Sequence, residues 1–217
     1  MIPHRIHPGR GRRAAALLCL VLAGGAGPGA LAHPGAPHPG APHPQAAPAL
    51  QRSVVAYRPA AVALTRADGK RVMLDDELAF DGPVALNFVF TTCSATCPIA
   101  SRTFAELQTR LQGRPLRLIS ISVDPLNDTP EVLRAYAGKF GAGPQWRFYT
   151  GGVDASEAAQ RAFDLYRGDK MNHAPVTLVR SAPGRPWIRL DGFPSAAQLA
   201  AELGEGGLVA QAQPQPK

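Results

Sequence analysis

Two cysteines and one histidine are the residues of this sequence best suited to chemistry. Cys93 and Cys97 form a C-x-x-x-C motif that is followed directly by Pro98. A thiolate is both a nucleophile and a metal ligand, and this spacing lets two sulfurs share a metal without excluding a disulfide between them. Taken alone, the motif favours metal or redox use no more than a structural bridge.

His173 is the third candidate. The other five of the six histidines precede residue 44, so His173 is the only one in the part of the chain predicted to fold. A lone histidine is more often a surface or hydrogen-bonded residue than a ligand. Together with two thiolates, however, an imidazole makes a soft set that suits Cu(I) and can hold Cu(II) with a weak further ligand. Zinc requires a fourth donor, and neighbouring Met171 is expected to pack rather than bind.

The cysteines are positioned by the elements on either side of them. Residues 84–90 form a nearly continuous apolar run, which predicts a strand buried on both faces. Residues 98–111 carry apolar residues at helical spacing, with Pro98 at the start of the predicted helix. The cysteines therefore lie at a helix N-terminus, where unpaired N–H groups and the helix dipole stabilise a thiolate.

The rest of the domain alternates between strands and helices. Asp68-Gly69 predicts a hairpin between residues 61–65 and 70–74. Further strands are predicted at 116–123, 146–149, 176–179 and 187–190, and further helices after the N-cap Thr129, at 155–165 and at 195–203. This order predicts an α/β, thioredoxin-like fold, with a central mixed sheet flanked by helices and an N-terminal β-hairpin. In such a fold the loop of His173 lies against the helix start that carries the cysteines.

The N-terminus has the pattern of an export signal. Residues 1–32 contain four arginines, no acid, an apolar stretch at 14–23 and the sequence Ala30-Leu31-Ala32. This predicts a signal peptide cleaved after Ala32, and hence a periplasmic protein. The apolar stretch is shorter than the roughly 20 residues that a membrane-spanning helix needs. Arg12-Arg13 leaves Sec or Tat export open.

Residues 33–50 repeat His-Pro and are predicted to form a disordered tail, followed by one domain at 51–205 and a second disordered tail at 206–217. His33, His38 and His43 are candidate accessory copper ligands, and a plain linker is the alternative interpretation. Removing residues 1–32 lowers the formal charge from +7 to +3, because four arginines and no acids are lost. No basic stripe is interleaved with aromatic residues, so nucleic acid is not an expected partner.

Three motifs in the same order resemble the Sco/SenC family of copper chaperones. They are residues 88–98 (FVFTTCSATCP), residues 120–130 (SISVDPLNDTP) and His173, within a resemblance that covers roughly residues 60–200. The resemblance implies that Cys93, Cys97 and His173 bind copper, as Cu(I) or Cu(II). It also implies that the protein delivers copper to, or maintains the thiols of, the Cu-A centre of a cytochrome c oxidase. The implied partners are the oxidase subunit carrying Cu-A or another copper protein, and an upstream copper donor or thiol reductant. The protein would then contact the membrane only through its client.

Two further questions stay open at this point. Asp124 ends a strand near the site and either supports the metal ligands or, like Asp128, serves as a turn and capping residue. The alternative function is that of a periplasmic thiol–disulfide oxidoreductase. In that case redox-active Cys93 attacks a client disulfide and Cys97 resolves the mixed disulfide. Whether the protein is an enzyme is therefore undecided by the sequence.

Overall fold

The computed structural model describes residues 49–58 and 61–204. The predicted signal peptide, His33, His38, His43 and the predicted C-terminal tail lie outside these residues. The described strands are β1 Gln51–Val55, β2 Ala63–Arg66, β3 Arg71–Met73, β4 Val84–Val89, β5 Arg117–Ser122, β6 Trp146–Thr150, β7 Val176–Arg180 and β8 Trp187–Asp191. The helices are α1 Leu74–Leu78, α2 Thr96–Arg110, α3 Pro130–Lys139, α4 Val153–Ala162 and α5 Ala196–Glu202, and η1 Lys170–Asn172 is a 3-10 turn.

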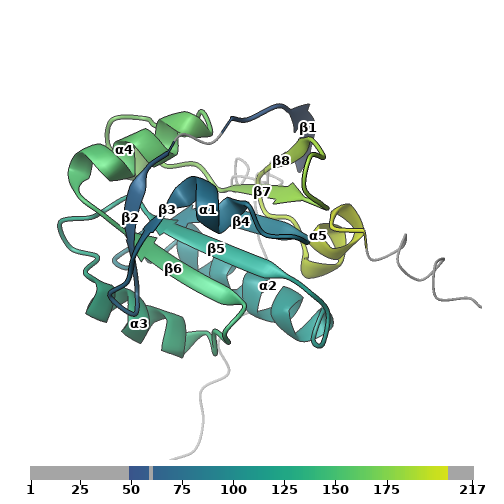
Figure 1. The fold of residues 1–217 in the computed structure, drawn as a ribbon, viewed down its shortest axis with the longest axis horizontal. Coiled ribbons are helices and arrows are strands. Elements are labelled where there is room, and N and C mark those ends of the chain that lie inside the picture. Colours follow the sequence, from purple (N-terminus) through teal and green to yellow (C-terminus); the bar gives the residue numbers. More distant parts are fainter. Residues whose placement is uncertain (1–48, 59–60, 205–217) are drawn as a thin grey trace, which may run out of the picture. The chain divides into compact units, whose positions relative to one another are not determined.

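The strands form one mixed sheet in the order β1-β8-β7-β4-β5-β6-β2-β3 (Figure 1). β4, β5 and β6 run parallel to one another, while β7 is antiparallel to β4. The carboxyl ends of β4, β5 and β6 therefore share one edge of the sheet with the start of β7 and the end of β8. We call this region the cysteine edge. It comprises residues 90–99, 123–133, 151–156, 168–175 and 192–195.

Helices cover both faces of the sheet, and the alternation of side chains along the strands divides the core between them. On β5, Leu118 packs with the apolar residues of α2, α3 and α5, whereas Ile119 and Ile121 pack with those of α1 and α4. β4 is buried at every position. Burial of apolar area on both faces of a central strand is the main stabilising contribution that this arrangement offers. It fixes the strand from which the cysteine loop emerges.

The predicted elements are all present, with ends displaced by a few residues. Thr129 caps α3 by accepting a hydrogen bond from the Val132 N–H, and Ser195 forms a capping box with Gln198 at α5. The predicted hairpin is β2–β3, which joins the sheet through β6. β1 and α1 were not predicted. In the part of the chain that the structure describes, no helix is both long and apolar enough to cross a membrane.

Candidate metal and thiol site

The two cysteines lie side by side but in different environments. Cys93 is half-buried in the loop after β4, and Cys97 is buried in the first turn of α2. Both are free thiols. The Cys97 backbone N–H donates a hydrogen bond to Cys93 Sγ at 3.4 Å, and Thr96 Oγ1 lies 3.6 Å from the same sulfur. The helix start thus directs donors at the sulfur of Cys93.

These contacts give the two thiols different pKa values. Burial alone would raise the pKa of Cys93, but hydrogen bonds from the Cys97 N–H and the Thr96 hydroxyl lower it to about 7. Cys97 is more deeply buried, and burial raises its pKa to about 12. Near neutral pH, Cys93 is therefore the thiol that ionises, while Cys97 keeps its proton.

His173 presents a free nitrogen lone pair inside the protein. Its Nε2 lies 3.1 Å from the carbonyl oxygen of Phe88. A carbonyl can only accept, so Nε2 carries the proton and Nδ1 carries the lone pair. Nδ1 is buried and has no hydrogen-bond partner. Burial also lowers the pKa of His173, which favours the neutral imidazole, the form of histidine that binds metals.

His173 and Cys97 line the same narrow cavity, between the end of β4, the start of α2 and the start of β7. Within the described residues, however, no three His, Cys, Asp or Glu side chains are already arranged to hold a metal ion. The structure therefore brings Cys93 beside Cys97 and His173 beside Cys97, without closing the three into a ready coordination sphere.

A buried carboxylate fixes the loop that carries Cys93. Asp128 is fully buried and accepts hydrogen bonds from the Thr91 N–H at 3.2 Å and the Thr91 hydroxyl at 2.6 Å. The Ser122 hydroxyl donates to its second oxygen at 2.6 Å. Asp128 was expected to serve only as a turn or capping residue, whereas it ties the cysteine loop to the end of β5.

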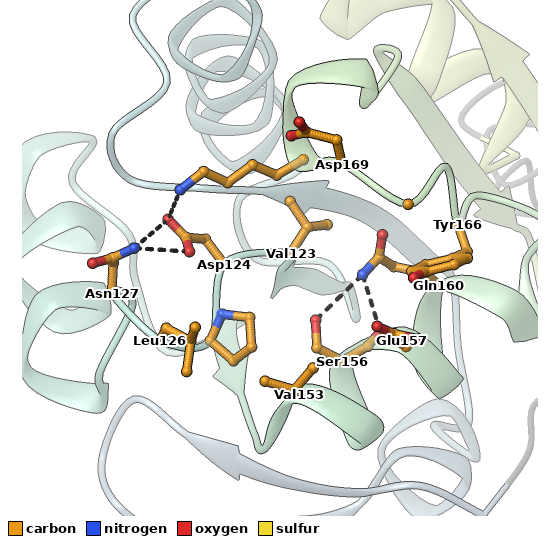
Figure 2. Close-up of a pocket in the computed structure, with 13 residues that line it drawn as sticks. Val123, Asp124, Leu126, Asn127, Val153, Ser156, Glu157, Gln160, Tyr166 and Asp169 are labelled. Atoms are coloured by element: carbon orange, nitrogen blue, oxygen red, sulfur yellow. Dashed lines mark hydrogen bonds and ion pairs between the residues drawn. The ribbon is translucent and has the colours of Figure 1, made fainter.

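A second carboxylate fixes the loop that carries His173. Asp124 accepts a hydrogen bond from the Asn127 side-chain amide at 2.9 Å and forms an ion pair with Lys170 at 2.5 Å (Figure 2). Lys170 is the first residue of η1, which ends one residue before His173. The Asp124 N–H in turn donates to Ser122 Oγ at 2.9 Å. Asp124, Ser122 and Asp128 thus form a chain of contacts between the two loops.

A cavity of about 520 Å³ opens beside the Asp124–Lys170 pair, between residues 123–127 and the first turns of α4 (Figure 2). The role of Lys170 had no signal in the sequence, since its partner is 46 residues away.

Met171 was expected to pack, and this is wrong: its side chain is 72% exposed. The proposed accessory ligands His33, His38 and His43 lie outside the described residues.

Comparison with known proteins supports the fold and assigns the family. The SCO1/SenC family model matches residues 61–203, about two thirds of the chain. A SCO1 protein homolog of Bacillus subtilis (strain 168) is 38% identical over 88 residues, which are 39% of this chain and only 44% of that relative's length.

Two solved structures share the fold. BsSco, described as a member of the Sco family of cytochrome c oxidase assembly proteins, aligns with a TM-score of 0.59 at 23% identity, over 72% of this chain and 97% of that one. Arabidopsis thaliana ScoI, solved with copper bound, aligns with a TM-score of 0.56 at 23% identity, over 69% and 96% of the two chains. The predicted thioredoxin-like α/β fold is confirmed, and the extent of the family match shows that this chain belongs to the SCO1/SenC family.

Proposed function

We propose that this protein is an exported metallochaperone that binds copper through Cys93, Cys97 and His173 in the domain at 51–205. The observation that carries the proposal is the unpartnered Nδ1 of His173. A buried polar atom without a hydrogen bond is costly, and a metal ion held between it and the neighbouring thiols would satisfy it. Copper is the cargo of such a protein rather than a resident cofactor.

The donor set fits Cu(I) well and Cu(II) with a weak additional ligand. Two thiolates and a neutral imidazole are soft donors, and three of them satisfy Cu(I). Because no ready coordination sphere exists among the described residues, we propose that copper draws the loop of His173 towards the two sulfurs. Binding must also displace the proton of Cys97, whose pKa is about 12, so copper affinity should rise with pH.

The client is proposed from the family. A structural relative belongs to the Sco family of cytochrome c oxidase assembly proteins, and another was solved with copper bound. We therefore propose that copper passes to the Cu-A-carrying subunit of a cytochrome c oxidase in the periplasm, after cleavage at Ala32. An upstream copper donor or thiol reductant would supply the reduced, loaded form. Contact with the membrane would come only through the client, and His33, His38 and His43 would be weaker accessory sites.

A second candidate function is thiol–disulfide exchange, and the unequal pKa values of Cys93 and Cys97 favour it. The Cys93 thiolate would attack one sulfur of a client disulfide, forming a mixed disulfide and releasing the first client thiolate. Cys97, on losing its proton, would attack Cys93 Sγ and release the second. The client gains two electrons, and Cys93–Cys97 becomes a disulfide.

Competition for Cu(I) between the reduced protein and a chromophoric chelator tests the proposal. We expect one tight equivalent, lost in Cys93→Ser and Cys97→Ser and strongly weakened in His173→Ala. Met171→Leu, on the same loop, is the matched control and should keep full affinity. His173→Ala should retain disulfide exchange, which separates the two candidate functions. Absence of tight copper, together with a readily reduced Cys93–Cys97 disulfide, would leave the oxidoreductase as the function.

A further inference from the structure

Asn87 carries a buried amide nitrogen without a partner. It lies within β4, paired with Ser120 of β5 and Thr177 of β7, and is only 1% exposed. Its side-chain nitrogen, Nδ2, has no hydrogen-bond partner among the described residues. Leaving a buried donor unpaired is costly, and native structures contain few such groups. The amide of Asn87 therefore calls for an acceptor other than those already within hydrogen-bond distance.

A relay of hydrogen bonds fixes which end of this amide is free. The indole nitrogen of Trp146 donates to Ser120 Oγ at 3.0 Å, and the Ser120 hydroxyl donates to Asn87 Oδ1 at 2.7 Å. An indole N–H can only donate, so the single hydroxyl hydrogen of Ser120 is left for Asn87. Rotating the amide by half a turn would leave that hydrogen without this acceptor. The relay therefore holds Oδ1 towards Ser120 and leaves the N–H groups of Nδ2 available.

The free amide belongs to the cavity that contains two of the proposed copper ligands. Asn87, Cys97 and His173 all line the narrow cavity between β4, α2 and the start of β7, whose volume is about 10 Å³. That volume holds about one water molecule. A group on one wall therefore reaches a group on another directly or through one water. Besides Asn87, the polar side chains that line the cavity are Thr96, Cys97 and His173.

Copper binding decides which of these groups is the acceptor. In the proposed function, copper takes up the lone pair of His173 Nδ1. The Thr96 hydroxyl lies 3.6 Å from the sulfur of Cys93, the other thiol. Cys97 is the side chain of the cavity that becomes an anion, because a cysteine binds a metal as the thiolate. A charged acceptor makes a hydrogen bond about twice as strong as a neutral one, so the amide of Asn87 is matched to the Cys97 sulfur.

We infer that Asn87 is a positioning residue of the copper site, whose amide donates a hydrogen bond to Cys97 Sγ, directly or through one water, when that sulfur holds Cu(I). The inference rests on the proposed function, because it names the residue that supports one of the copper ligands. Each sulfur then has its own donors, which are the Cys97 N–H and Thr96 for Cys93, and Asn87 for Cys97. Removing a group that hydrogen-bonds to a metal ligand typically weakens metal binding about 10- to 100-fold.

The first test is Cu(I) competition with a chromophoric chelator for Asn87→Leu, which keeps the size of the side chain but removes the donor. We expect Cu(I) binding to be about tenfold weaker. The matched control is Thr177→Val, which removes a buried hydroxyl at the paired position of β7, outside the cavity. Both variants should lose some stability in urea denaturation, because each disturbs a buried polar group, but Thr177→Val should keep full Cu(I) affinity.

The His173→Ala background shows on which ligand the amide acts. If it acts on Cys97, adding Asn87→Leu to His173→Ala should weaken the remaining Cu(I) binding by the same factor of about ten. No further loss in that background would overturn the inference and assign the amide to His173.

Nuclear magnetic resonance of the side-chain amide of Asn87 gives a readout that needs no variant. We add one equivalent of Cu(I) to the reduced, ¹⁵N-labelled protein. One amide proton should move downfield, because it gains a charged acceptor. This measurement decides the question even if Asn87→Leu does not fold.

Three other results would overturn the inference. They are equal Cu(I) affinity in Asn87→Leu and the unaltered chain, an equal loss in Thr177→Val, and an amide signal that Cu(I) does not move. Failure of the proposed function is distinguishable from these results. If the unaltered chain binds no tight Cu(I), the proposed function and the inference both fall. Tight Cu(I) binding that does not depend on Asn87 keeps the proposed function and overturns the inference alone.

Discussion

Buried carboxylates form hydrogen-bond networks at opposite ends of the parallel strands. The two networks differ in the residues that donate to the carboxylates. At the end far from the cysteines, Glu77 accepts hydrogen bonds from Arg147 at 2.7 Å and from the Tyr149 hydroxyl at 2.6 Å, with Arg117 at 3.8 Å. At the cysteine edge, Asp128 and Asp124 accept from loop residues and from Lys170. The first network joins helix α1, which carries Glu77, to strands β5 and β6. The second joins loops to a strand end.

Buried carboxylates have a different structural role at each end of the sheet. β5 and β6, which carry the partners of Glu77, are already fixed by the sheet, so their network contributes to stability rather than to the position of any loop. The loops at the cysteine edge have no sheet pairing of their own. Their carboxylate contacts therefore decide where Cys93 and His173 lie. Substitutions in the two networks should separate stability from copper affinity.

The largest effect on stability is expected at Glu77. Glu77→Ala leaves Arg147 and Tyr149 without their partner in a largely buried place, which should lower the free energy of unfolding by about 3 kcal/mol. Copper affinity should be unchanged. Chemical denaturation and Cu(I) competition measure the two quantities, and Glu106→Ala, an exposed position on α2, is the control. A large loss of copper affinity in Glu77→Ala would show that the two ends are not independent.

The stability contributed by Glu77 should also depend on pH. Burial alone would raise the pKa of Glu77, but hydrogen bonds from Tyr149 and Arg147 lower it below its usual value of 4.5. A carboxyl with a lowered folded-state pKa contributes stability that is present above 4.5 and is lost as pH falls through the folded value. The stability difference between the unaltered chain and Glu77→Ala should therefore shrink below pH 4.5, as measured by denaturation at a series of pH values.

At the cysteine edge, Asp128→Ala should affect both quantities. It removes the acceptor of two hydrogen bonds from Thr91 and one from Ser122. We expect a loss of about 2 kcal/mol in unfolding free energy, and about tenfold weaker Cu(I) binding because the cysteine loop is released. Asp128→Asn keeps one acceptor oxygen, so its unfolding free energy and Cu(I) affinity should lie between those of the unaltered chain and of Asp128→Ala. Unchanged copper affinity in a destabilised Asp128→Ala protein would contradict the positioning role.

The sequence predicted those elements of the fold that local residue patterns encode. The apolar run of β4 and the N-cap Thr129 are local signals, and the structure contains both. The helix predicted at 195–203 is also present, with Ser195 as its N-cap. β1 was missed because four of its five side chains are exposed, so it has no alternation to detect. α2 begins at Thr96 rather than at Pro98, which puts Cys97 inside the first turn and makes its burial differ from that of Cys93.

The candidate residues were predicted, but their supports were not. Cys93, Cys97 and His173 stand out by residue type and spacing. The Asp124–Lys170 pair joins residues 46 apart, and the free Nδ1 of His173 follows from a contact with Phe88 across 85 residues. Such contacts depend on the register of the whole sheet, and no local pattern encodes them.

The Asp124–Lys170 pair should give a smaller effect than Asp128. Lys170 is about one third exposed, so solvent screens the pair and its loss should cost under about 1 kcal/mol of stability. The double variant Asp124→Asn/Lys170→Met avoids leaving an unpaired buried charge. We expect Cu(I) binding to weaken about fivefold through faster release, as the loop of His173 loses its anchor. Stopped-flow transfer to a chelator measures release, and an unchanged release rate would exclude the anchor.

The smallest effect should appear in the alkylation rate of Cys93, whose thiol is influenced mainly by its immediate neighbours. Its pKa of about 7 depends on hydrogen bonds from the Cys97 N–H and Thr96, so its reaction with iodoacetamide in a Cys97→Ser background should rise with pH around a midpoint near 7. Adding Thr96→Val removes one donor and raises that pKa, which should slow alkylation at pH 7 roughly two- to threefold. Adding Glu77→Ala instead should leave the profile unchanged, because Glu77 lies at the opposite end of the sheet. A shifted profile in that variant would mean that the far network also sets the charge on the cysteine, and stability and thiol chemistry could no longer be assigned to separate ends.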